Sequence, residues 1–293
     1  MKSGDQKKAY IYGIGAVLIW STVASAFKLT LRYLSFIEML FWASFTSIVI
    51  LFIILFFQKK VYLVFGYKWK EYARSLALGC LNPFLYYLVL FKAYSLLRAQ
   101  EALTLNYTWA IMLVLLSIPL LGQRIGLKSI FAIIISFFGA FIIAVEGKIL
   151  NFHFTNLTGV LLALGSSLIW AIFWIYNIRD ERDVVAKLFL NFSFGFIFII
   201  IYTLLFLSPS IRFPGLYGAV YIGLFEMGIT FILWLKALQM SETTGRVANL
   251  IYLSPFLSLI FINYLVGERI LVSSIIGLIL IIAGIILQQR SER

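Results

Sequence analysis

Residues 91–143 read FKAYSLLRAQEALTLNYTWAIMLVLLSIPLLGQRIGLKSIFAIIISFFGAFII, and residues 235–287 read LKALQMSETTGRVANLIYLSPFLSLIFINYLVGERILVSSIIGLILIIAGIIL. The second stretch repeats the first, because apolar runs, turn residues and glycines return in the same order after 144 or 145 residues. The apolar segment before each stretch repeats as well. The matching positions are Ala93 with Ala237, Gly122-Gln123-Arg124 with Gly267-Glu268-Arg269, Gly139 with Gly284, and Leu18-Ile19-Trp20 with Leu168-Ile169-Trp170.

The repeat predicts the topology of the whole chain. About 20 apolar residues cross a bilayer, and each copy holds five such segments. An odd number of crossings turns the second copy over relative to the first, as in many transporters. We therefore expect an all-α integral membrane protein with ten transmembrane helices in two inverted five-helix repeats, at 9–146 and 158–289. The expected spans are 9–30, 36–57, 73–97, 101–121, 127–146, 158–178, 187–208, 215–237, 244–266 and 271–289.

Composition agrees with a membrane protein and excludes other classes. The chain is 62% hydrophobic and 12% charged, with a mean hydropathy of +1.01. A soluble domain is about half apolar and a quarter charged. The single cysteine, Cys80, allows no internal disulfide, and the single histidine, His153, leaves no metal cluster to propose. The sequence holds no nucleotide-binding glycine loop and no nucleophile–base set, so we expect neither an enzyme nor a bound cofactor.

The positive charges predict an orientation in the membrane. A net charge of +12 would suggest nucleic acid in a soluble protein, but these residues lie mostly between apolar runs. With the N-terminus inside, 17 Lys and Arg residues lie on the inner side and 7 on the outer side. The positive-inside rule then places both termini in the cytoplasm, with the chain in a prokaryotic plasma membrane. A cleaved signal peptide ending near Ala26 is the alternative; it would remove Leu18-Ile19-Trp20, which has a counterpart in the second copy.

Glu226 is the strongest candidate for a functional residue. It lies near the middle of the eighth span, where a carboxyl group is costly unless it is paired or faces water. On an α-helix, Thr230 and Trp234 share its face. Glu226 could bind a substrate amine or carry a coupling proton. The alternative is a hydrogen-bonded glutamate that only joins helices.

Two polar clusters lie on repeat-related spans. In the third span, Asn82 and Tyr86 flank Pro83, and a proline there kinks the helix and frees backbone carbonyls. The fourth span and its counterpart, the ninth, carry further amide and aromatic side chains. These could orient a polar ligand or simply join helices, and Pro83 and Pro255 are possible hinges. The residues of the fourth and ninth spans are Asn106, Tyr107, Trp109, Asn249, Tyr252 and Pro255.

Aromatic and small residues complete the pattern. Trp20, Trp170 and Trp174 lie nearer mid-span than interface anchors do, so they could line an organic-solute pocket or pack in the core. The fifth and tenth spans carry small residues at helical spacing, which indicates close helix packing inside the chain or, alternatively, a dimer contact. These small residues are Ala132, Ser136, Ala140, Ala144, Gly277 and Gly284.

The duplicated pattern of an apolar span, Gly-Gln/Glu-Arg and a glycine-bearing apolar span resembles the EamA family of the drug/metabolite transporter superfamily. Gly267-Glu268-Arg269 matches the short motif of that family, whereas Gln123 replaces its glutamate in the first copy. The resemblance covers nearly the whole chain. It implies ten helices, of which the first four in each repeat surround a central cavity and the fifth lies at the periphery.

A finer resemblance concerns the substrate. Residues 105–109, LNYTW, are similar to the Asn-Tyr-x-Trp stretch of aromatic amino-acid exporters, in which this helix lines the cavity. Trp20 and Trp170 also match tryptophans of that subgroup, whereas Asn82-Pro83 and Glu226 depart from it. The resemblance implies an exporter of amino acids, including aromatic ones.

We therefore predict a secondary transporter that exports small organic metabolites by alternating access through a central cavity. Its partners would be the substrate and the lipid bilayer, with no nucleic acid, and the protein would be a monomer or a homodimer. The alternative is an importer or exchanger of another metabolite class, such as nucleotide-linked or phosphorylated solutes. It would need cationic residues at the cavity, for which only Lys28 and Lys92 are candidates. A non-transporting scaffold or sensor would instead have a dry centre with Glu226 paired to Asn82 or Asn249.

Overall fold

The computed structural model describes residues 6–109, 111–112, 115–116, 120, 127–148, 156–206, 213–240 and 249–291. Within these ranges the elements are helices, with no strand, as the sequence predicted. The elements are α1 (Gln6–Thr30), α2 (Phe36–Phe57), η1 (Val61–Phe65), α3 (Trp69–Gly79), η2 (Cys80–Leu85), α4 (Tyr86–Leu96), α5 (Ala99–Asn106), α7 (Leu127–Ala144), α8 (Leu157–Ile178), α9 (Val184–Phe206), α10 (Phe213–Tyr221), η3 (Ile222–Ile229), α11 (Thr230–Met240), η4 (Asn249–Tyr252), α13 (Leu253–Phe261), η5 (Ile262–Val266) and α14 (Val272–Ser291).

These helices match the predicted spans in length and polarity. Six are long and apolar enough to cross a membrane, and three shorter apolar helices cover Ile130–Ile143, Leu253–Val266 and Val272–Leu287. The fourth predicted span begins as α5 and then enters a part of the chain that lies largely outside the described residues. The same holds for Gly122-Gln123-Arg124 and for His153.

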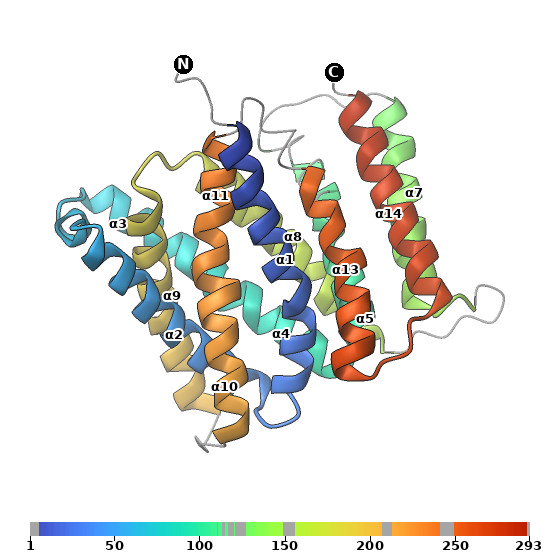
Figure 1. The fold of residues 1–293 in the computed structure, drawn as a ribbon, viewed down its shortest axis with the longest axis horizontal. Helices are drawn as coiled ribbons and strands as arrows, with labels where there is room; N and C mark the ends of the chain where they lie inside the picture. The colour runs from blue at the N-terminus through green and yellow to red at the C-terminus, as the bar shows by residue number, and fades with distance from the viewer. Residues whose placement is uncertain are drawn as a thin grey trace.

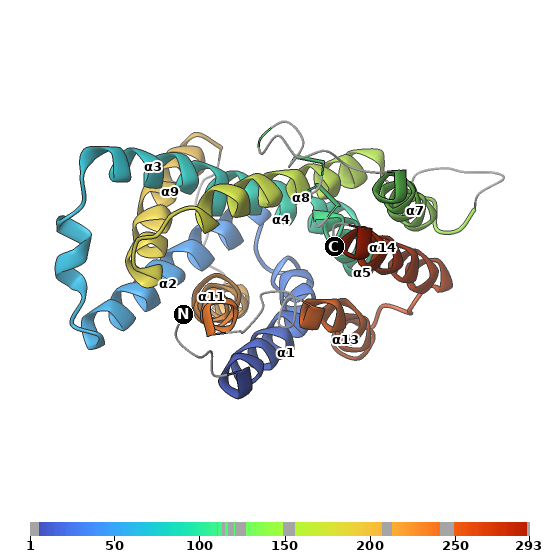
Figure 2. The ribbon, with the colours of Figure 1, turned by 90° about the horizontal axis from the view of Figure 1, so that it is seen from above.

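The helices form one bundle with a separate pair at its side. α1 begins and α14 ends at the same end of the bundle (Figure 1), which is the predicted cytoplasmic end. We call this the inner end and the opposite one the outer end. α7 and α14 lie side by side at the edge of the molecule in both views (Figures 1 and 2). The small residues expected there form their contact, since a Cβ on Gly284 would lie 2.5 Å from the Ala132 carbonyl oxygen and one on Gly277 would lie 2.6 Å from that of Gly139.

Two glycines join the repeats in matching ways. A Cβ on Gly79 would lie 2.2 Å from the carbonyl oxygen of Asn191, and one on Gly223 would lie 2.2 Å from that of Ala43. Gly223 follows Gly79 by 144 residues, one of the offsets of the sequence repeat. In each contact the third span of one repeat therefore touches the second span of the other. The glycine has no side chain and so allows the two backbones to approach closely.

The Gly-Glu-Arg motif holds the two repeats together at the outer end. Gly267 ends η5 in the left-handed conformation, with a φ of 81°. The Glu268 carboxylate then accepts a hydrogen bond of 3.0 Å from the backbone N–H of Ala99, the first residue of α5. Gln100 donates to the Arg269 carbonyl at 2.9 Å. The motif thus supplies acceptors to a helix start in the other repeat, where unpaired N–H groups need them.

We expect Gly223→Ala to lower the free energy of unfolding by about 1–3 kcal/mol, because the added methyl group meets the Ala43 backbone. Gly165→Ala is the matched control, since a Cβ there meets nothing within 4 Å. That change should be neutral or stabilise by up to about 1 kcal/mol, because glycine is unfavourable inside a helix. Thermal unfolding in detergent measures both. Equal melting temperatures for the two variants would contradict the close contact.

Candidate functional site

The Glu226 carboxyl is buried at the contact between the repeats. Glu226 lies in η3 with 6% of its surface exposed. The Tyr87 hydroxyl, from α4 in the other repeat, donates a hydrogen bond of 3.0 Å to Oε1. Trp20 of α1 makes a second polar interaction with this carboxyl group. Oε2 has no hydrogen-bond partner among the described residues, so one carboxyl oxygen is available to a ligand or a proton.

Both third spans depart from a regular α-helix at the equivalent position. η2 is broken at Asn82, and η3 is a π-helical segment that contains Glu226, 144 residues later. π-helical segments occur often at functional sites. Thr230, the first residue of α11, was expected to share the face of Glu226. Its hydroxyl donates to the carbonyl of Phe225 in η3, five residues earlier.

Aromatic rings surround the carboxyl group. The ring centroids of Trp20 and Trp234 lie 5.4 Å apart. On the Tyr87 side, Tyr86 stacks on Trp170 with centroids 4.4 Å apart, and Trp174 stacks on Phe231 at 6.2 Å. The predicted tryptophans of α1, α8 and α11 therefore lie in two aromatic groups beside Glu226. Such a wall suits an organic solute with an apolar or aromatic part.

Asn106 connects the fourth span to its neighbours. Its amide nitrogen donates to Ser166 of α8 at 2.8 Å, and its amide oxygen accepts from the Tyr86 hydroxyl at 3.4 Å. These bonds orient Asn106, whichever of its two predicted roles it has. Tyr107 and Trp109 are partly buried against the core. Asn249 and Tyr252 belong to η4, but their side chains lie outside the described residues.

The two prolines differ from each other. Asn82, before Pro83, has a non-helical φ of −149° and ψ of 118°, so the third span is broken at this point, and its peptide bond to Pro83 is cis. Pro255 lies in the first turn of α13, where a proline leaves the helix intact. The predicted flex point at Pro83 coincides with a kink, whereas Pro255 causes no break in α13.

Four tyrosines of the first repeat lie near the Glu226 carboxyl group. They are Tyr86, Tyr87, Tyr94 and Tyr107. In the described chain no lysine or arginine forms an ion pair with it. Lys28 instead donates to the carbonyls of Tyr94, at 3.0 Å, and Leu97 at the end of α4. The Lys92 ammonium lies 4.8 Å from the ring centre of Phe36. Neither cation supports the alternative of a site for phosphorylated solutes.

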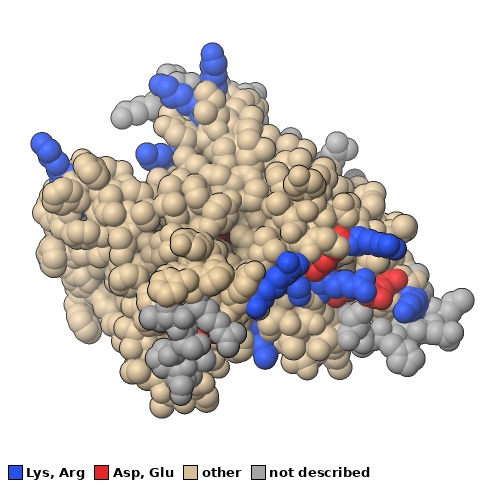
Figure 3. Space-filling model, turned by 60° about the horizontal axis from the view of Figure 1, so that its bottom comes forward, with Lys and Arg blue, Asp and Glu red and all other residues tan. Residues whose placement is uncertain are grey.

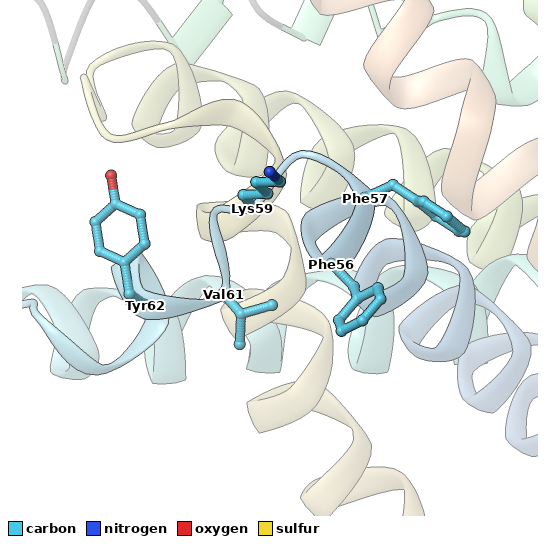
Figure 4. Close-up of a pocket in the computed structure, with 5 residues that line it drawn as sticks. All are labelled: Phe56, Phe57, Lys59, Val61 and Tyr62. Atoms are coloured by element: carbon cyan, nitrogen blue, oxygen red, sulfur yellow. The ribbon is translucent and has the colours of Figure 1, made fainter.

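Two surface features are separate from this site. At the outer end, basic and acidic side chains gather on one side and leave most of the face uncharged (Figure 3). Arg98 and Glu146 form an ion pair of 3.2 Å there. At the inner end, Phe56, Phe57, Lys59, Val61 and Tyr62 line an open hollow of about 420 Å³ (Figure 4). Exposed aromatic and basic side chains at a span end are typical of the membrane interface.

Among the described residues, His, Cys, Asp and Glu form no group of three that could hold a metal ion.

Sequence reasoning missed the partner of Glu226. Tyr87 follows Tyr86, which was selected, and nothing in its local sequence distinguishes it. Phe231 and Ser166 were also missed. One available signal was the offset of 144 residues, which pairs Asn82 with Glu226 and identifies both as the centre of a repeated feature.

Comparisons with known proteins agree with this architecture. The model of the EamA-like transporter family matches residues 7–145 and 157–288. An uncharacterised transporter, YoaV, from Bacillus subtilis is 24% identical over 279 residues, which cover 93% of each chain. An uncharacterised transporter from Clostridium kluyveri is 25% identical over 67% of this chain, and the match covers 65% of that relative's own length. A protein crystal structure shares the fold with a TM-score of 0.67 and 20% identity, covering 98% of this chain and 99% of the other.

We expect Tyr87→Phe to lower the free energy of unfolding by about 1–3 kcal/mol, because the buried Glu226 carboxyl then loses its hydrogen-bond donor. In the double variant with Tyr87→Phe and Glu226→Leu, the hydroxyl and the carboxyl group are both absent. The losses of stability caused by the two single changes should therefore not add. Unfolding of all four proteins in detergent gives this coupling energy. Tyr94→Phe is the control, since the buried ring stays and its hydroxyl has no hydrogen bond to a described residue. Additive effects of Tyr87→Phe and Glu226→Leu would contradict the pairing.

Proposed function

Because the chain belongs to the EamA-like transporter family, we propose that it is a secondary transporter that exports amino acids, including aromatic ones, through the site around Glu226. The protein is a multi-pass membrane transporter, as its family and its apolar helices show. The finer proposal rests on one observation: a buried carboxyl group has one unpartnered oxygen and lies between aromatic rings at the contact of the two repeats.

The chemistry of this site favours a substrate with an ammonium group. A carboxylate accepts strong hydrogen bonds from an ammonium group, and the aromatic faces nearby attract the same positive charge. With no cation paired to Glu226 in the described chain, a substrate amine meets no competing charge. An apolar or aromatic side chain of the substrate would then contact Trp20, Trp170 and Trp234. A carboxylate on the substrate would rely on neutral donors such as Asn106.

The position of Glu226 also supports alternating access. Its hydrogen bond to Tyr87 joins the third span of the second repeat to that of the first. A substrate amine or a proton that takes the place of this donor changes a contact on which the relative position of the repeats depends. The break in η2 and the π-helical segment η3 lie in the same two spans and provide points where these spans could bend. In this proposal both termini lie in the cytoplasm of a prokaryote and transport runs outward.

We expect Glu226→Gln to reduce efflux of the transported amino acid by about tenfold or more, because the charge-assisted hydrogen bond to the substrate amine is lost. Purified protein in liposomes loaded with radiolabelled amino acids gives the rate, measured with and without a pH gradient. If Glu226 carries a coupling proton, the pH gradient should increase the efflux rate of the parent protein and leave that of Glu226→Gln unchanged. Aromatic amines that have the same side chains as these amino acids but lack the carboxylate show which group of the substrate the site recognises.

Glu181→Gln is the control, since Glu181 is exposed in the α8–α9 loop. This variant should transport at the parental rate. Equal reconstitution is checked by protein content and thermal unfolding. Parental efflux by a folded Glu226→Gln protein would remove Glu226 from the mechanism. Absence of flux for every amino acid, with flux of another solute, would overturn the substrate class but keep the transporter.

A further inference from the structure

Three buried asparagines have no partner for their side-chain amides. Asn82, Asn177 and Asn191 have 0% of their surface exposed. Neither the nitrogen nor the oxygen of any of these amides forms a hydrogen bond with a described residue. An unsatisfied buried polar group is unfavourable, so such groups usually meet water or a ligand. Only Asn82 was selected from the sequence.

The asparagines follow one side of α9 from the inner end towards the centre. Lys187, in the first turn of α9, donates to the backbone carbonyl of Asn177 at 3.0 Å. Asn191 follows one turn later, on the same helix face, and its own carbonyl contacts Gly79. One further turn along, a Cβ on Gly195 would lie 2.5 Å from the ring of Pro83, next to Asn82. Asn177 therefore lies nearest the inner end and Asn82 lies deepest.

The deep end of this row meets the break in the third span. Backbone without regular helical geometry is tolerated at membrane depth where protein buries it or where it lines a water-filled cavity. The backbone of Asn82 is non-helical in this sense. Tyr87, which donates to Glu226, lies in α4, which follows η2 in the same span. The row of asparagines therefore ends in the span that carries the donor to Glu226.

Charged groups lie at the inner end of the row. Arg182 donates to both carboxylate oxygens of Asp180, at distances from 2.6 to 3.1 Å, and to Ser75 of α3 at 2.9 Å. Burial opposes ionisation of Asp180, but the hydrogen bonds and charge of Arg182 outweigh it and lower the pKa of this carboxyl from its ordinary value. Asp180 is therefore ionised at neutral pH. The row therefore begins beside a buried ion pair, and Asp180 also lies 3.9 Å from the exposed guanidinium of Arg74 at the inner end.

The repeat-related positions of Asn177 and Asn191 in the other half of the molecule are apolar, whereas that of Asn82 is Glu226. The matching glycine contacts pair Asn191 with Ala43, and the offset of 150 between Trp20 and Trp170 pairs Asn177 with Phe27. Phe27 packs edge-on against Phe91, with ring centroids 4.8 Å apart. Amides that only joined helices would be equally useful at the inner and the outer end. Asn177 and Asn191, however, are replaced by Phe27 and Ala43 at the outer end.

We propose that Asn82, Asn177 and Asn191 line a hydrated access path from the inner end of the molecule to the Tyr87–Glu226 pair. Asparagine amides both donate and accept, so they can satisfy water and the neutral polar groups of a passing solute. The role of this path in delivering substrate or protons rests on the transport function proposed above. The path itself is a property of the protein that can be measured without any substrate.

Cysteine labelling tests the path directly. In a Cys80→Ala background, Asn177→Cys and Asn191→Cys are each exposed to a charged, membrane-impermeant thiosulfonate in vesicles of known orientation. We expect cytoplasmic reagent to react with both at least about tenfold faster than with Ala43→Cys, because only a hydrated thiol ionises readily to the reactive thiolate. Ala43→Cys is the matched control, since it occupies the repeat-related position of Asn191.

Labelling as slow as that of Ala43→Cys, or labelling only from the outer side, would overturn the path. No substrate is added, so this failure differs from a failure to transport amino acids. Asn191→Leu supplies a second measurement. If the amide faces water, the variant should unfold close to the parental temperature, because no hydrogen bond within the protein is lost. A clear loss of thermal stability would indicate a helix-joining role and contradict the proposal.

Discussion

The hydrocarbon core of a bilayer offers no hydrogen-bond partner, and this constraint governs where polar groups occur in the protein. Each polar group inside a span must be matched by the protein itself or by water. The Tyr87–Glu226 bond meets the requirement for one oxygen of the carboxyl group and leaves the other without a partner among the described residues. The third spans depart from a regular α-helix at repeat-related positions, and Asn82 in the first of them also lacks a side-chain partner among the described residues.

The scaffold that places these groups depends on close backbone contacts. Gly79 and Gly223 bring each third span against the second span of the other repeat, with no room for a side chain. Without the hydrophobic effect between helices in lipid, such contacts are a main source of attraction. The α7–α14 pair uses the same kind of contact, but it lies at the edge of the molecule (Figure 2), away from Glu226. The fifth helix of each repeat can therefore stabilise the fold without taking part in the site.

The helical class, the spans and the repeats could be predicted because apolar length and repeated glycines are visible along the chain. Glu226 became a candidate because of its predicted depth alone. Its partner could not be predicted, since the contact with Tyr87 depends on how α4 and η3 pack against each other across the repeats. The same limit applies to Thr230, whose hydrogen bond follows π-helical spacing, and to Pro255, whose effect depends on where α13 begins. Asn177 and Asn191 lie near span ends or face a neighbouring helix, and sequence alone does not separate them from ordinary packing residues.

Divergence between the repeats makes the two ends of a nearly symmetric scaffold chemically different. The offset of 144 pairs Asn82 with Glu226 and Tyr87 with Phe231, so the ionisable group and its donor come from different repeats. The inner half carries Asn177 and Asn191 where the outer half carries Phe27 and Ala43. Two inverted copies of one sequence would present the same surroundings to both sides of the membrane. In the proposed mechanism the shared scaffold lets the two repeats exchange positions, and the unlike side chains at these few positions make the two routes to the carboxyl group different.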